Sequence, residues 1–177
     1  MKLVNWKDDF LKRVVIIGAG ASGMLAAKVA SDRGYKVTVL EKQKRCGQKL
    51  LITGKGRCNI TNNCEIEELI ENVPTNGKFL YSAFYTFTND QVIDMFNDLG
   101  VETKTERGKR VFPVSDKAVD VVRALEKQMR SNKNVEVLLN SKVDKIEAQD
   151  GKVKKVILSD KREIECDSVI VATGGVS

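Results

Sequence analysis

The chain has 177 residues, of which 42% are hydrophobic and 31% are charged, and its formal net charge is +6. This length allows one domain with a sizeable hydrophobic core, and the composition is ordinary for a globular protein. No run of residues approaches the roughly 18 apolar residues of a membrane-spanning helix, so we expect no membrane partner. The chain contains no histidine, which argues against histidine-based proton transfer and against ordinary zinc sites.

The positive charge suits an anionic ligand, but its distribution disfavours a nucleic-acid partner. Lysine and arginine recur along 42–49, 104–110 and 152–162, with acidic residues among them, as on a solvated surface. Residues 1–12 contain no apolar signal core, so we expect a short leader before a domain of 13–177. The cysteines have no C-x-x-C spacing and fit a reducing, cytoplasmic location. They are Cys46, Cys58, Cys64 and Cys166.

The strongest signal lies in residues 13–41. The β-branched run Val14–Ile17 predicts a buried parallel strand, and a G-x-G-x-x-G pattern at Gly18–Gly23 opens a helical segment. A second buried strand at Val37–Leu40 ends at Glu41. The glycines would allow a tight turn, a close approach to a pyrophosphate and close packing of helix on strand. Free N–H groups at the helix start would hold the phosphates, and Glu41 would accept hydrogen bonds from a ribose.

A glycine-tightened turn without a ligand is the alternative interpretation of this segment. A lone G-x-G-x-x-G is weak evidence. Here strand, turn, helix, strand and acid follow one another within about 30 residues, as a dinucleotide-binding βαβ unit requires. The order of the elements therefore favours dinucleotide binding.

Residues 42–64 are too glycine-rich and polar for a long regular element. They predict a flexible cationic loop at the carboxyl end of the second strand, where open α/β sheets bind ligands. A solvated basic loop is the alternative. Within this loop Cys58 is a candidate reactive thiol, but no base lies nearby in the sequence, which favours an ordinary polar-loop cysteine.

The middle of the chain predicts helices over 65–99, a small hairpin over 101–112 and another helix after Ser115-Asp116. Aromatic residues at helical spacing usually belong to a core. We therefore predict burial of five rings: Phe79, Tyr81, Phe84, Tyr85 and Phe87.

The last third of the chain departs from an ordinary nucleotide-binding half. A third core strand is predicted at Val135–Leu139 and a closing buried strand at 168–172. Between them, where a crossover helix is usual, three alternating segments predict an antiparallel β-meander with a hairpin turn at Asp150-Gly151. The segments are Lys142–Ala148, Val153–Ser159 and Glu163–Cys166.

Three segments carry a resemblance to a known family: Gly47 to Asn62, with its Gly-Arg-Cys-Asn-x-Thr-Asn portion, Arg110 to Pro113, and the closing Ala-Thr-Gly-Gly-Val-Ser at 172–177. The chain resembles the bacterial NAD(P)/FAD-dependent oxidoreductases of the BaiN and aminoacetone-oxidase-like flavoprotein family, of the two-dinucleotide-binding-domain type. The resemblance implies an α/β, Rossmann-like FAD-binding domain with a parallel central sheet and a three-stranded antiparallel β-meander crossover.

The resemblance also implies cofactor-binding residues in the nucleotide-binding half. Glu41 would bind the adenosine ribose, and the backbone of Val143 would bind the adenine. Residues facing the pyrophosphate would be Gly18, Gly20, Ala21, Ser22 and Gly23, with Ala172, Thr173 and Gly174 from the closing strand.

The cationic loop would supply the remaining FAD contacts. Four residues would line the cofactor on the loop side: Lys42, Gln48, Lys49 and Leu50. Four would approach the ribityl chain or flavin ring: Arg57, Cys58, Asn59 and Thr61. Lys55 and Arg57 are candidates for stabilising a reduced flavin, and no residue is identified as a catalytic acid or base.

The resemblance implies hydride transfer through FAD, with NAD(P)H as a further candidate cofactor and a small molecule as substrate. Family members continue past the Ala-Thr-Gly-Gly turn, so we expect an N-terminal portion that lacks the substrate domain and the final FAD segment. Two alternatives stay open. One is an NAD-binding Rossmann domain, against which the meander and the loop argue. The other is a cofactor-free fragment that self-associates through an exposed sheet edge.

Overall fold

The computed structural model describes residues 12–175, and nearly all of the expected leader lies outside them. The described residues form two compact units, one of 12–48 with 125–175 and the other of Lys49–Ala124. Within 12–175 no helix is long and apolar enough to cross a membrane. The two units are described separately below.

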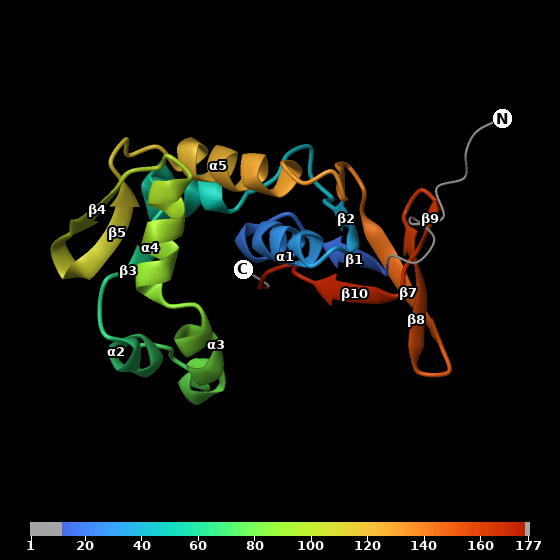
Figure 1. Ribbon diagram of the computed structural model, residues 1–177, viewed down its shortest axis with the longest axis horizontal. Helices are drawn as coiled ribbons and strands as arrows, with labels where there is room; N and C mark the ends of the chain where they lie inside the picture. Colours follow the sequence, from blue (N-terminus) through green and yellow to red (C-terminus); the bar gives the residue numbers. More distant parts are fainter. Residues whose placement is uncertain (1–11, 176–177) are drawn as a thin grey trace. The chain divides into compact units, whose positions relative to one another are not determined.

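The first unit is built on a four-stranded parallel sheet, as the sequence predicts. The strand order is β10-β1-β2-β6, and the closing strand therefore lies beside the first strand (Figure 1). The strands are β1 (Arg13–Ile17), β2 (Lys36–Leu40), β6 (Val135–Leu138) and β10 (Ser168–Val171). Parallel strands end at the same edge, so the segments that follow β1, β2 and β10 leave the sheet at one edge.

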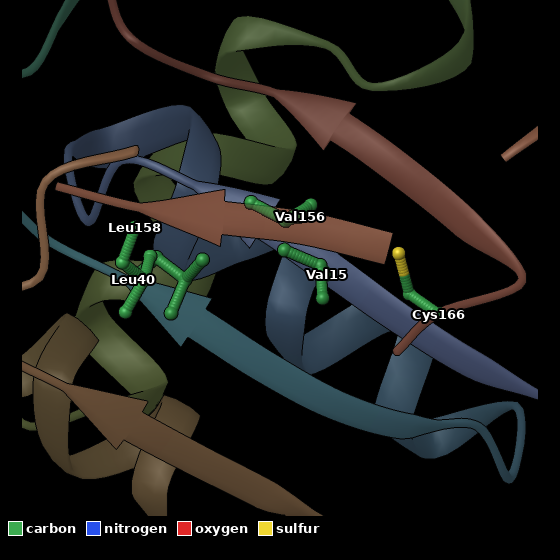
Figure 2. Packing of buried hydrophobic residues seen from close by; sticks show 5 residues of the cluster. All are labelled: Val15, Leu40, Val156, Leu158 and Cys166. Atoms are coloured by element: carbon green, nitrogen blue, oxygen red, sulfur yellow. The ribbon is translucent and has the colours of Figure 1, made fainter. Parts of the chain in front are cut away.

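Both faces of this sheet are covered. Helix α1 (Ala21–Asp32) buries Met24 and Ala27 and contacts β1 and β2. The opposite face packs against the meander through a cluster that contains Val15 and Leu40 (Figure 2). Because side chains alternate along a strand, β1 can bury Val14 and Ile16 on one face and Val15 on the other, which explains its continuous apolar run.

The predicted meander is confirmed. Its strands are β7 (Val143–Gln149), β8 (Lys152–Leu158) and β9 (Glu163–Glu165), paired in the order β7-β8-β9. Asp150 and Gly151 both have positive φ, 53° and 70°, as a tight hairpin turn requires. The inward side chains of β8, Val156 and Leu158, are fully buried against the sheet (Figure 2).

The second unit contains a small antiparallel sheet and short helices. The sheet has the order β3-β5-β4 and confirms the predicted hairpin, with β3 as an addition that the sequence did not indicate. Its strands are β3 (Thr61–Asn62), β4 (Thr103–Glu106) and β5 (Arg110–Pro113). The helices are η1 (Leu50–Gly56), α2 (Ile66–Glu71), η2 (Gly77–Leu80), α3 (Tyr81–Thr86), α4 (Asn89–Asp98) and η3 (Arg107–Lys109). Helix α5 (Ala118–Arg130) contains the division between the units.

The predicted burial of the aromatic residues in this unit is wrong. Phe79 is 85% exposed and Tyr81 is 54% exposed, and the Tyr85 and Phe87 side chains are also exposed. Only Phe84 is half-buried. Helices α2 and α3 are six residues long, so each has too little surface to cover a face of the other. Helical spacing places the rings on the helix, but burial requires a second apolar surface.

Candidate functional site

The turn between β1 and α1 is packed so closely that two of its glycines have no room for a side chain. A Cβ on Gly18 would lie 2.5 Å from the backbone oxygen of Ala172, and Gly18 has φ +105°. A Cβ on Gly23 would lie 1.9 Å from the oxygen of Gly18. The first and third glycines of the motif are therefore required by contacts within the protein itself.

The second glycine of the motif differs from the other two. A Cβ built on Gly20 meets no atom within 4 Å, so packing within the described residues does not require glycine there. Gly20 is the N-cap of α1, which has no side-chain cap and no acidic residue in its first turn. Ala21 and Ser22 are exposed. The structure thus brings together open space and an uncapped helix N-terminus, which suit a phosphate.

Glu41 lies against the same turn. Its carboxylate accepts one hydrogen bond from the Ala19 backbone N–H at 2.8 Å and another from the Gln43 N–H at 2.9 Å. The side chain is 9% exposed, and these bonds fix its position. Each carboxylate oxygen has two lone pairs, so Glu41 keeps the capacity to accept hydrogen bonds from a ribose.

The chain after Glu41 folds back onto the glycine motif. The Gly47 N–H donates to the Ala19 oxygen at 2.8 Å. Gln48 accepts a hydrogen bond from Arg45 at 2.7 Å, and Lys42 is exposed. Lys42 and Gln48 therefore belong to a loop that is attached to the glycine turn between β1 and α1.

The closing strand and the meander also contribute predicted residues to this unit. The Ala172 N–H donates to the Ile17 oxygen at 2.8 Å, which extends the pairing of β10 with β1 beyond Val171. Thr173 and Gly174 follow and are exposed. The Val143 side chain packs against the core cluster, which leaves its backbone as the part available for the expected adenine contact.

Six predicted site residues lie in the unit of Lys49–Ala124. The side chains of Lys49 and Asn59 are exposed, and those of Leu50, Thr61 and Arg57 are half-buried. Thr61 pairs with Val111 in the small sheet. The sixth residue, Cys58, is 1% exposed. Their expected contacts with a cofactor remain predictions.

The buried position of Cys58 bears on its proposed reactivity. Burial raises the pKa of its thiol, whereas the side-chain hydrogen bond of Thr53 lowers it by a smaller amount. The thiolate is the nucleophilic form, so this cysteine is predominantly an unreactive thiol at neutral pH. The structure favours the interpretation of Cys58 as an ordinary structural cysteine.

The partners of Arg57 are not apparent from the sequence. Its guanidinium donates to Glu106 at 2.9 Å and to Asp116 at 3.3 Å, residues 49 and 59 positions further along the chain. No local spacing rule connects positions this far apart. The contact between Glu41 and the Ala19 backbone is likewise not predictable from local spacing, because it depends on how the turn folds.

The family of the chain follows from its sequence as a whole. The model of the HI0933-like protein Rossmann domain matches residues 12–177. The chain belongs to this family. Its relatives include the 3-dehydro-bile acid delta(4,6)-reductase of Clostridium scindens, 34% identical over 93% of this chain, and the ribosomal RNA dihydrouridine synthase of Haemophilus influenzae, 31% identical over 92%. The expected relationship to FAD-dependent oxidoreductases is confirmed.

The chain spans 39% and 40% of the length of these two relatives. Among solved structures, the Mycobacterium smegmatis Sdh1 complex in the apo form has a TM-score of 0.69 at 20% identity, over 94% of this chain and 35% of that one. Thermovibrio ammonificans THI4 has a TM-score of 0.62 at 14% identity, over 96% of this chain and 60% of that one. At these identities the likeness supports the Rossmann-like fold alone.

Proposed function

We propose that the chain binds FAD, with the pyrophosphate at the Gly18–Gly23 turn and the adenosine ribose at Glu41. The observation that carries this proposal is the open space at Gly20, beside an uncapped helix N-terminus, within a turn whose other two glycines are fixed by packing. An anion would occupy this space without displacing protein atoms. The residues present therefore fit the phosphates of the cofactor.

The choice of FAD over NAD rests on the β-meander that connects β6 to β10 and on the family to which the chain belongs. Glu41 suits the ribose of either dinucleotide. The β-meander stands where an NAD-binding half usually has a helix, and the chain belongs to a family related to FAD-dependent oxidoreductases. When bound, FAD supplies the ring that exchanges hydride with a substrate. The residues of this chain would bind and orient the adenosine end of the cofactor.

The experiment is a titration of the chain with FAD, followed by flavin fluorescence, beside a parallel titration with NAD. Gly20→Val should weaken FAD binding by about tenfold or more, because its side chain fills the space proposed for the phosphates, and tenfold corresponds to about 1.4 kcal/mol. The control is Val29→Ala on the same helix, at a side chain that is 43% exposed.

Two results would contradict the proposal. One is NAD binding without FAD binding. The other is equal FAD affinity in Gly20→Val and the control while circular dichroism shows both to be folded. Because Gly20 has no packed neighbour within 4 Å of a Cβ, we expect Gly20→Val to keep its fold. Loss of binding would then report on the site.

We further propose that this chain takes part in the reduction of a ring carbon–carbon double bond, with NAD(P)H as hydride donor. The support is that one relative is named a delta(4,6)-reductase and another a dihydrouridine synthase. These names include a small molecule and an RNA as substrates. Anaerobic mixing of the FAD-loaded protein with NADH or NADPH tests the donor, since bleaching of the flavin absorbance is expected. Absence of bleaching with both would reject it.

A further inference from the structure

The Arg57 side chain makes its polar contacts within the unit of Lys49–Ala124. One guanidinium nitrogen, Nη1, lies 2.9 and 3.1 Å from the two carboxylate oxygens of Glu106 and 3.3 Å from an oxygen of Asp116. The guanidinium carbon lies 4.1 Å from the ring centroid of Phe112, a distance suited to a cation–π contact. Arg57 therefore connects its loop to β4, to β5 and to the segment that precedes α5.

The charges around Arg57 cancel. Lys104 Nζ lies 2.7 Å from Asp116 and 3.6 Å from Glu106, so two cations alternate with two carboxylates. The hydrogen bond from Lys104, followed by that from Arg57, lowers the pKa of Asp116, which keeps this carboxyl ionised at neutral pH. A group with no net charge offers little electrostatic stabilisation to a reduced, anionic flavin.

The loop that carries Arg57 has an unfavourable backbone conformation. Positive φ angles occur at Gly54, Lys55, Gly56 and Cys58. Lys55 and Cys58 have side chains, for which the left-handed region costs energy. Such conformations persist when the surrounding structure holds them. Arg57 lies between these residues and supplies polar anchors to two other segments.

We propose that Arg57 is a positioning residue, which holds the loop of residues 50–58 against β4 and β5 through Glu106, Asp116 and Phe112. The family resemblance implies that Arg57 approaches the flavin. In this proposal Arg57 instead shapes the loop and does not place its charge on the cofactor. The proposed role of this loop in cofactor binding rests on the proposed FAD function. The contacts that hold the loop in place are independent of that function.

The first test measures the loop without any cofactor. Cys58 is 1% exposed, so its reaction with a thiol reagent reports opening of the loop. Tandem mass spectrometry of the proteolytic peptide that carries both Cys58 and Cys64 assigns the label to one of the two. Arg57→Met and Glu106→Gln should each raise the Cys58 labelling rate by about tenfold, because local opening becomes easier. The Cys58 labelling rate of Arg57→Lys should lie between the rates of these two variants and that of the parent.

The matched control is Arg110→Met. The Arg110 guanidinium carbon also lies over the Phe112 ring, at 5.8 Å, but its Nε donates to the Arg107 backbone oxygen rather than to the carboxylates. We expect its Cys58 labelling rate to stay within about twofold of the parent. Parent-like labelling in a folded Glu106→Gln variant would overturn the proposal, even if Arg57→Met does not fold.

The second test measures FAD affinity in the same variants. A positioning role predicts a loss of FAD affinity in both Arg57→Met and Glu106→Gln. The double variant should lose no more than Arg57→Met alone, because the contact with Glu106 is one of those that Arg57→Met already removes. Loss in Arg57→Met with parent affinity in Glu106→Gln would show direct contact with the cofactor and overturn the proposal. If the parent chain binds no FAD, the proposed function fails, while Cys58 labelling still decides the role of Arg57.

Discussion

Glu41 connects β2 to the turn that precedes α1, and its two backbone hydrogen bonds make it a structural residue as well as a candidate ribose ligand. An amide at this position would offer one acceptor oxygen and would place an NH₂ group against a backbone N–H donor. The nearly complete burial of the side chain prevents water from replacing the lost bond. The same side chain therefore influences both folding and binding.

We predict that Glu41→Gln lowers the free energy of unfolding by about 1–3 kcal/mol, because a buried N–H loses its charged acceptor. Urea denaturation followed by circular dichroism measures this. The control is Glu136→Gln, which changes an exposed carboxylate on β6 of the same sheet. Equal stability of the two variants would show that the Glu41 bonds contribute nothing.

Cys46 introduces a dependence of stability on alkaline pH. Burial, followed by the charge of Glu126, raises the pKa of its thiol from 9.0 to about 11. The unfolded thiol therefore loses its proton at a lower pH than the folded one. Stability contributed by the buried neutral thiol is present below pH 9 and is lost as the pH rises toward 11.

We predict that the free energy of unfolding of the parent falls by about 1–3 kcal/mol more than that of Cys46→Ala between pH 9 and 11. Urea titrations across this range give the two slopes. The alanine variant has a lower stability near neutral pH because of the cavity it creates, so the difference in slope is the informative quantity. Parallel pH profiles would contradict the assignment to Cys46.

At the scale of elements, β10 is one of the two edge strands of the parallel sheet, and the prediction that this closing strand is buried is wrong. It pairs with β1 on one side and, within residues 12–175, has no strand on the other. Val171 is 63% exposed and Ile170 is 38% exposed. An apolar edge with unpaired backbone groups favours pairing with another chain. Self-association of this chain stays a prediction, and the structure indicates β10 as the strand through which it would occur.

We predict that the chain self-associates with increasing concentration and that Val171→Lys weakens this association by about fivefold or more, since a charged residue disfavours edge pairing. Sedimentation velocity over a concentration series measures it. Val29→Lys on α1 is the control, because its parent side chain is also exposed, at 43%. Association weakened equally by both variants would indicate a general charge effect and would reject β10 as the interface.

At the scale of the molecule, the two units differ in how they hold their predicted site residues. The first combines the glycine turn, Glu41 and the end of β10 around one sheet edge. The second places Arg57 in a network of ion pairs and buries Cys58. The proposed cofactor contacts are thus supported by geometry at the adenosine end, while the contacts proposed for the loop rest on the family resemblance.

The sequence by itself determined the parallel strands, the glycine turn, the meander and the family, because these depend on local patterns: β-branched runs, glycine spacing and period-two alternation. The place of Glu41 after β2 also predicts it as a ribose ligand. Only the tertiary structure showed that Gly20 faces open space, that Arg57 binds Glu106 and that Phe79 is exposed. Each of these depends on which surfaces meet, and a local pattern specifies a face of an element but not the partner that covers it.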